Sequence, residues 1–308
     1  MTWAFITPPV DPKAGFEGRL GSMAIRNPIE WIFTAPPGQV AKIGAATPKE
    51  YWQNRSTASE PVIKRTGWRD IQFALSCGID DFKANRTDIV MLAIIYPIAV
   101  LLGVVATARH AIIPMIFPIV SGFTLIGPLA TIWLAELSRR REAAGSTSLA
   151  DAAGVIRSPQ IGAILGLGAC EIVLYLAWIA TAAVIFRATI GPTVPGSITE
   201  FVATVFGTPA GWFLIIAGVG TGFFFALIGL VIGCISMPLL LDRPVSVATA
   251  VSTSIKAFRT NPGTILTWGA VVVGGIILGA IPLLFGLVVI VPILGHATWH
   301  LYRRTVAN

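Results

Sequence analysis

Glu171 is the residue of this chain that is best placed to do chemistry inside a membrane. It lies about ten residues into an apolar run, from about Ile161 to Phe186, which is long enough to cross a bilayer. A charged carboxylate at that depth costs on the order of 3 kcal/mol or more, so it should be protonated, paired or facing water. Two roles stay open for Glu171. It is a proton or substrate site in a cavity, or a neutral carboxyl that joins helices by a hydrogen bond.

His296 and His300 form the second candidate pair. They are four residues apart, so on a helix they share one face, about 6 Å apart along the axis. Such a pair could hold haem or a metal, relay a proton, or lie in an interfacial belt with Trp299. A zinc or copper site needs further ligands, of which Glu136 and His110 are the candidates. The topology predicted below places His110 on the other side of the membrane, so we predict the belt and no metal.

No sequence pattern in the chain predicts an enzyme. Phosphate loops, nucleophile elbows and zinc-protease motifs do not occur. Asp80 and Asp81 lie on a predicted surface helix, where we interpret them as capping or solvated residues. We therefore predict a protein without catalytic residues or cofactors, in contact with bound lipids.

The composition indicates a protein with several membrane spans. Hydrophobic residues make up 55% of the chain and charged residues 12%, whereas soluble domains carry about 25% charged residues. The net charge of +7 comes from Lys and Arg beside apolar runs, and no basic helix or nucleic-acid-binding motif stands apart from them. This placement argues against nucleic acid as a partner.

The predicted fold class is an all-α membrane protein. A bilayer core of about 30 Å needs roughly 20 helical residues, and the alternation typical of barrel strands is missing. We predict six transmembrane helices in three hairpins, each hairpin preceded by an interfacial amphipathic helix. The predicted spans are about 89–106, 112–135, 161–186, 211–240, 264–280 and 283–302. The predicted surface helices are about 66–87, 148–157 and 244–258.

Two of the predicted links between spans carry recognisable signals. Leu137–Arg141 contains three arginines and is predicted to be a basic loop. Ser197–Glu200 fits a capping box at the start of a short helix.

The basic residues predict the orientation. With six spans, 20 of the 22 Lys and Arg lie on the side of the N-terminus, and Arg109 and Arg187 lie on the other. The positive-inside rule then places both termini in the cytoplasm of a bacterial inner membrane. Residues predicted to anchor the chain at the lipid interface are Trp68, Arg139, Arg140, Arg141, Trp299, Arg303 and Arg304.

The two predicted regions are an irregular arm, residues 1–65, and a six-span membrane domain, residues 66–304. Prolines throughout the arm prevent a long helix. It is either a disordered tail or an extended arm that lies on a partner or on the membrane, and its aromatic residues favour the second alternative. The predicted partner contacts are Trp3, Phe5, Trp31, Phe33 and Trp52.

Three motifs resemble an uncharacterised bacterial family of predicted integral membrane proteins. They are Gly122–Pro128, Glu136–Arg140 and the closing motif Leu294–Arg303, and the resemblance covers about residues 67–304. Some members of that family are loosely labelled as similar to cytochrome c oxidase subunits. The resemblance implies a six-span inner-membrane protein and supplies no catalytic residues. Three histidines are too few for a catalytic oxidase subunit.

Three hypotheses of function follow. The first is a non-enzymatic accessory or assembly subunit of a respiratory or photosynthetic complex, which contacts other subunits through the arm and the span faces. The second is a small-solute or proton-coupled transporter that uses Glu171. The third, which we rank last, is a haem- or metal-binding redox protein that uses His296 and His300.

Overall fold

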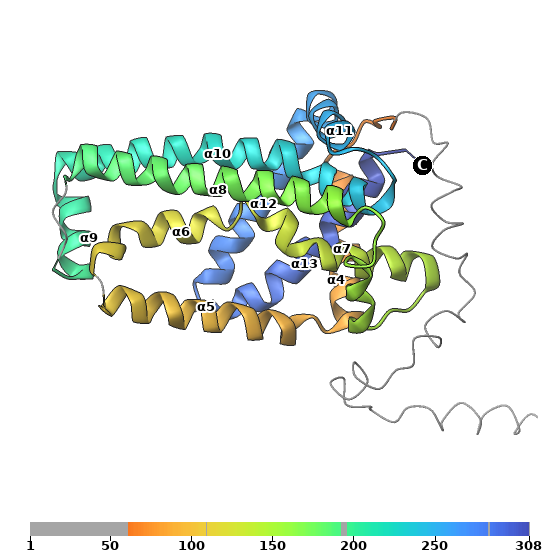
Figure 1. Ribbon diagram of the computed structural model, residues 1–308, viewed down its shortest axis with the longest axis horizontal. Coiled ribbons are helices and arrows are strands. Elements are labelled where there is room, and N and C mark those ends of the chain that lie inside the picture. Colours follow the sequence, from red (N-terminus) through yellow and green to blue (C-terminus); the bar gives the residue numbers. More distant parts are fainter. Residues whose placement is uncertain (1–60, 109, 192–195, 283, 308) are drawn as a thin grey trace, which may run out of the picture. The chain divides into compact units, whose positions relative to one another are not determined.

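The computed structural model describes residues 61–307 except 109, 192–195 and 283 (Figure 1). Regular structure in these residues is helical, apart from one isolated bridge between Ile63 and Val306. The helices are α4 (Trp68–Asn85), α5 (Asp88–Ala108), η1 (His110–Met115), α6 (Ile116–Gly122), α7 (Gly127–Ala144), η2 (Leu149–Gly154), α8 (Ile161–Thr189), α9 (Ile198–Gly207), α10 (Pro209–Asp242), α11 (Val247–Thr260), α12 (Pro262–Ala280) and α13 (Phe285–Thr305). The prediction of an all-α fold is confirmed.

Five segments of the described chain are long and apolar enough to cross a membrane. They are Ile112–Ala144, α8, α10, α12 and α13. Each corresponds to one predicted span, with ends that differ by a few residues except in the first. The predicted first span is the 21-residue helix α5, which is not among the five. Six spans in three hairpins therefore stay a prediction.

The predicted second span is a broken helix. Pro114 lies inside η1, and Pro118 lies within the first turn of α6. Hydrogen-bonded turns over Phe123–Ile126 end α6, and Pro128 then starts α7 where a missing N–H is tolerated.

The prediction of a basic loop at Leu137–Arg141 is wrong. These residues continue α7, which ends only at Gly145, a residue in the left-handed conformation that favours glycine. The sequence Glu-Leu-Ser-Arg-Arg-Arg is helical because Glu136 pairs with arginines three and four residues later.

The helices outside the spans agree in part with prediction. α4 and α11 occur where surface helices were predicted, but residues 149–154 form a short 3₁₀ helix and not an α-helix over 148–157. The predicted cap of α9 is confirmed, since the Ser197 hydroxyl accepts a hydrogen bond from the Glu200 N–H at 3.1 Å.

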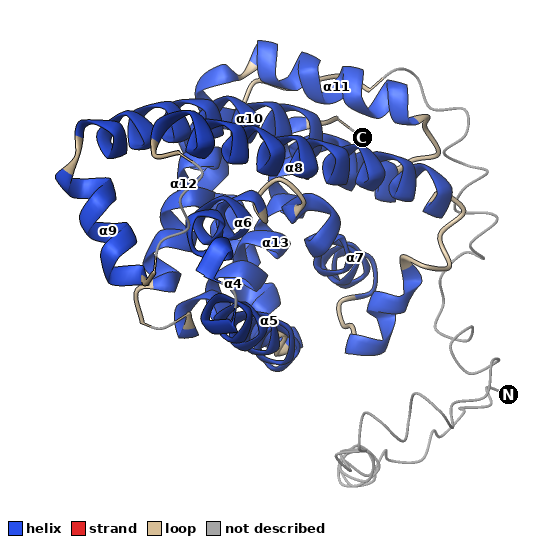
Figure 2. Ribbon diagram, turned by 60° about the vertical axis from the view of Figure 1, so that its left-hand side comes forward, coloured by secondary structure: helices blue, strands red, loops and turns tan. Residues whose placement is uncertain are grey.

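α13 is the helix on which the described part is assembled. It packs against α4, α5, α7 and α12, while α8 lies alongside α10 (Figures 1 and 2). The buried core joins the ends of α7, α10 and α13 to α4 and α11. The apolar outer faces of α8 and α10 remain exposed, as expected for helices in lipid.

Asn261 joins the first described residues to the membrane helices. Its amide accepts from the Thr66 N–H at 2.8 Å and donates to the Lys64 carbonyl at 2.9 Å. The segment also pairs with the C-terminal end, where the Lys64 N–H donates to the Thr305 carbonyl. Residues 61–65, predicted as part of the arm, are thus fastened to the helical domain.

Candidate functional site

Glu171 lies where the broken helix restarts. It is 2% exposed, and its Oε2 accepts a hydrogen bond from the Leu129 N–H at 3.1 Å. Leu129 is the third residue of α7, so this N–H is one of the first-turn donors that have no partner within the helix. Glu171 caps α7 from the neighbouring helix α8, at the positive end of the α7 dipole.

The depth of Glu171 in the membrane stays a prediction, with which its position on α8 agrees. Glu171 comes ten residues after Ile161, the start of α8, which is about 15 Å along the axis. That is about half the thickness of a bilayer core. A hydrogen bond to a charged group contributes about 1.5–3 kcal/mol, which is close to the cost of placing a carboxylate at that depth.

One oxygen of Glu171 has no partner in the described chain. Oε1 is buried and accepts no hydrogen bond. It lies against Gly233 of α10, where an added Cβ would come within 2.8 Å of Oε1 and 2.7 Å of Pro128 Cγ. Gly233 therefore lets three helices meet at the carboxyl group, and leaves Oε1 available for a proton, a water molecule or a cation.

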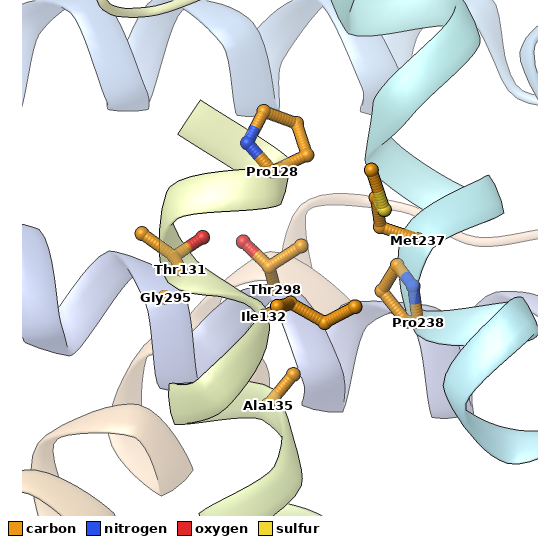
Figure 3. A pocket seen from close by; sticks show the side chains of 8 residues that line it. All are labelled: Pro128, Thr131, Ile132, Ala135, Met237, Pro238, Gly295 and Thr298. Carbon is orange, nitrogen blue, oxygen red and sulfur yellow. The ribbon is translucent and has the colours of Figure 1, made fainter. Parts of the chain in front are cut away.

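A small cavity adjoins this site (Figure 3). It has a volume of about 10 Å³ and lies between α7, α10 and α13. This is about the smallest space that holds one water molecule. The hydroxyls of Thr131 and Thr298 point toward one another in it. Its lining residues are Pro128, Thr131, Ile132, Ala135, Met237, Pro238, Gly295 and Thr298.

A second polar cluster joins α4, α7 and α13. His300 Nε2 lies 2.8 Å from Asp81 Oδ2, and Arg141 pairs with Asp81 Oδ1. His296 Nδ1 lies 2.8 Å from Ser138 Oγ, while its Nε2 is buried with no partner among the described residues. The two histidines share a face of α13, as predicted, but each faces a different polar group.

Asp81 is the anion of this cluster. Burial raises the pKa of its carboxyl, but hydrogen bonds from His300, Ser138 and Arg141 outweigh burial and lower the pKa to about 2. The interpretation of Asp81 as a capping or solvated residue is therefore wrong. The helical spacing of α4 places Asp81 beside the apolar face of that helix. The sequence could not show that Arg141 of α7 lies opposite Asp81.

Most of the predicted interface residues take part in ion pairs or hydrogen bonds with acidic residues. Glu136 is fully buried and pairs with Arg139 and Arg140, so both of its oxygens are occupied. Trp299 is 1% exposed and donates to Glu142, which also pairs with Arg303.

These ion pairs do not test whether the predicted residues anchor the chain in lipid or contact a partner. Trp68 is exposed, and Arg304 pairs with Asp70. Lipid anchoring by these residues stays a prediction. The five aromatic residues predicted to contact a partner lie outside the described residues.

The metal hypothesis has no geometric support. Within the described residues, no group of three or more His, Cys, Asp or Glu side chains could hold a metal ion. Both carboxylate oxygens of Glu136 accept hydrogen bonds from arginines, Oε2 from Arg139 and Oε1 from Arg139 and Arg140.

A family model matches one part of the chain, from α6 to α10. Residues 116–242 match the DUF2189 family, described as predicted integral membrane proteins. The predicted resemblance to an uncharacterised membrane family is confirmed over these residues, and the protein is an integral membrane protein. The comparisons with curated proteins and with solved structures gave no match.

The DUF2189 stretch contains the whole Glu171 site. Glu171, Leu129, Pro128 and Gly233 all fall within it. The histidine cluster does not, because α4 and α13 lie outside the matched residues. Sequence reasoning found Glu171 from its predicted depth but missed Leu129 and Gly233, which are apolar or small residues in apolar runs.

Proposed function

We propose that this protein is a proton-coupled transporter of small solutes in which Glu171 takes up the proton. The observation that carries the proposal is the buried carboxyl group at the start of α7, with Oε2 hydrogen-bonded and Oε1 unpaired in the described chain. Helices that break in mid-membrane and point their positive ends at a polar site are a feature of secondary transporters. The proposal places six spans in a bacterial inner membrane, with both termini in the cytoplasm.

The energies that stabilise and destabilise the charged form of Glu171 are of similar size, so its carboxyl group can gain or lose a proton easily. The Leu129 hydrogen bond and the α7 dipole stabilise the charged form, while burial at about 15 Å depth opposes it. A small change in helix packing would then be enough to shift the balance. α7 and α8 can provide such a change because α7 is separated from α6 by a turn.

Charge movement in proteoliposomes tests this proposal. Purified protein on a solid-supported membrane receives a pH jump, and then a panel of amino acids, sugars and organic cations under a proton gradient. We expect a transient current in the wild type and at least a tenfold smaller current in Glu171→Gln. Glu171→Asp should retain part of it, because the carboxyl group remains.

Glu200→Gln is the matched control. It makes the same change of carboxylate to amide at an exposed position in α9. Its current should equal that of the wild type. A wild type without proton-dependent current, or a Glu171→Gln current of full size, would overturn the proposal.

The accessory-subunit hypothesis is the second candidate. Its predicted contact residues of the arm lie in residues 1–60, outside the described part. Its predicted contacts through the span faces and its respiratory or photosynthetic setting stay predictions. Purification in mild detergent separates it from transport: a partner at fixed stoichiometry would favour the subunit, and an isolated protein that carries current would favour the transporter.

A further inference from the structure

Five basic side chains without an ion-pair partner gather near the junction of α11 and α12. We call them the basic patch: Lys64, Arg65, Arg69, Lys256 and Arg259. All five residues are exposed, and within the described part of the chain their side chains have no ion-pair or hydrogen-bond partner. The arginines that the sequence predicted as lipid anchors differ in this respect, since acidic residues pair with them.

The contacts of Asn261 bring the two parts of the patch together. Its amide donates to the Lys64 carbonyl and accepts from the Thr66 N–H. The Thr264 hydroxyl of α12 adds a third hydrogen bond, to the Thr66 carbonyl at 2.8 Å. The first described residues, orange in Figure 1, therefore run past the end of α11, where Arg259 comes two residues before Asn261.

The helices turn the remaining patch residues outward. Lys256 and Arg259 are three residues apart on α11, so their side chains share one face. Ala257 and Ser254 are buried against the other helices, which leaves that basic face outside. Arg69 is the second residue of α4 and is exposed.

The chain offers these cations no acidic counterpart. Residues 61–69 and 243–308 contain no Asp or Glu. Asp70 is already occupied, because it pairs with Arg304 and accepts from the Gly67 N–H. Residues 1–60 contain six Lys and Arg against five Asp and Glu, so the predicted arm has no negative net charge to match the patch. The complementary charge must come from another molecule.

The patch lies at the start of a predicted span. α12 begins at Pro262, three residues after Arg259, and is long and apolar enough to cross a membrane. Leu266, one turn into α12, is 42% exposed, as expected of a side chain in contact with lipid. Trp68, next to Arg69, is 55% exposed, and tryptophan is enriched at the level of the headgroups.

We infer that the basic patch binds the headgroups of anionic phospholipids and selects these lipids over zwitterionic ones. Lys and Arg donate charge-assisted hydrogen bonds to phosphate oxygens. Clusters of about four to eight basic residues beside a span are typical of sites for anionic headgroups. A soluble acidic protein would meet the same charges, but a lipid also accounts for the exposed Trp68 and Leu266 beside them. The inference does not depend on transport or on Glu171.

Native mass spectrometry of the detergent-purified protein tests this inference. The protein is mixed with equal amounts of anionic phosphatidylglycerol and zwitterionic phosphatidylcholine, and the lipids that stay bound are counted. We expect the wild type to retain at least about fivefold more phosphatidylglycerol than phosphatidylcholine. Lys256→Gln combined with Arg259→Gln should lower this ratio severalfold, and adding Lys64→Gln and Arg65→Gln should bring it close to one.

Lys83→Gln combined with Arg157→Gln is the matched control. It also removes two exposed basic side chains, one near the C-terminal end of α4 and one ahead of α8. Its lipid ratio should equal that of the wild type. If the patch variants do not fold, the wild type alone remains decisive, because about 0.5 M NaCl should bring its ratio close to one by screening.

Three results would overturn the inference. The first is a wild type that retains both lipids equally or keeps its preference in high salt. The second is an equal loss of preference in the control and in the patch variant, which would show an effect of net charge alone. The third is displacement of phosphatidylglycerol by millimolar inorganic phosphate at constant ionic strength, which would assign the patch to free anions.

Discussion

Asp81 pairs electrostatically with residues of both α7 and α13 and so joins α4 to these two helices. Arg141 and His300 come from two different helices and meet on its two oxygens. Removing one member of a buried ion pair leaves the others without compensation, which is more destabilising than the loss of an exposed pair.

We predict that Asp81→Asn lowers the stability by about 2 kcal/mol at pH 7. The estimate follows from the lowering of the pKa from 3.8 to about 2, at about 1.4 kcal/mol per unit. The midpoint of thermal unfolding in detergent should fall. Asp80→Asn is the control, since the neighbouring Asp80 is 65% exposed and should change the midpoint little.

The difference in thermal midpoint between the wild type and Asp81→Asn should also depend on pH. Because the folded pKa of Asp81 is depressed, its contribution is complete above the unfolded pKa near 4 and is lost as the pH falls toward 2. The difference in midpoint between the wild type and Asp81→Asn should therefore be constant from pH 7 to about 5 and shrink below pH 4. A difference that persists at pH 2 would contradict this assignment.

At the scale of elements, the approach of α10 to α7 and α8 depends on Gly233. We predict that Gly233→Ala destabilises the protein by about 1–3 kcal/mol, because the new methyl group meets Pro128 and Glu171. In infrared spectra, this change should also shift the C=O stretching band of the protonated Glu171 carboxyl group, since that group must move.

Gly218→Ala is the control on the same helix. No atom lies within 4 Å of the Cβ that it would add. This change should be neutral or stabilising by up to about 1 kcal/mol, through helix propensity alone. Equal thermal midpoints for the two variants would show that the close approach at Gly233 contributes nothing.

At the scale of the whole described chain, Asn261 joins its first residues to the start of α12. We predict that Asn261→Ala destabilises this junction by about 1–3 kcal/mol, because it leaves the Thr66 N–H and the Lys64 carbonyl without partners. Trypsin should then cleave after Lys64 and Arg65 severalfold faster than in the wild type.

Thr260→Ala provides the comparison for the proteolysis. Thr260 is exposed, and its hydroxyl bonds only to the Lys256 carbonyl within α11. Its cleavage rate should match that of the wild type. If Asn261→Ala is cleaved no faster than Thr260→Ala, another contact holds the segment.

The apolar helices, their approximate ends and the place of Glu171 within an apolar helix follow from the sequence alone. Length, hydropathy, prolines and caps are local properties, so α8, α10, α12, α13 and the Ser197 cap could be predicted. The helical arginines of α7 were missed, because their pairing with Glu136 competes with the tendency of charged runs to form loops.

The tertiary structure decided which atoms meet. A helix that is apolar on all sides has no polar face, so its sequence does not show which side turns toward a neighbour. The cap of α7 by Glu171, the contact with Gly233 and the pairing of Asp81 with His300 each join helices far apart in the chain. They depend on the rotation and depth of whole helices, and only packing determines both.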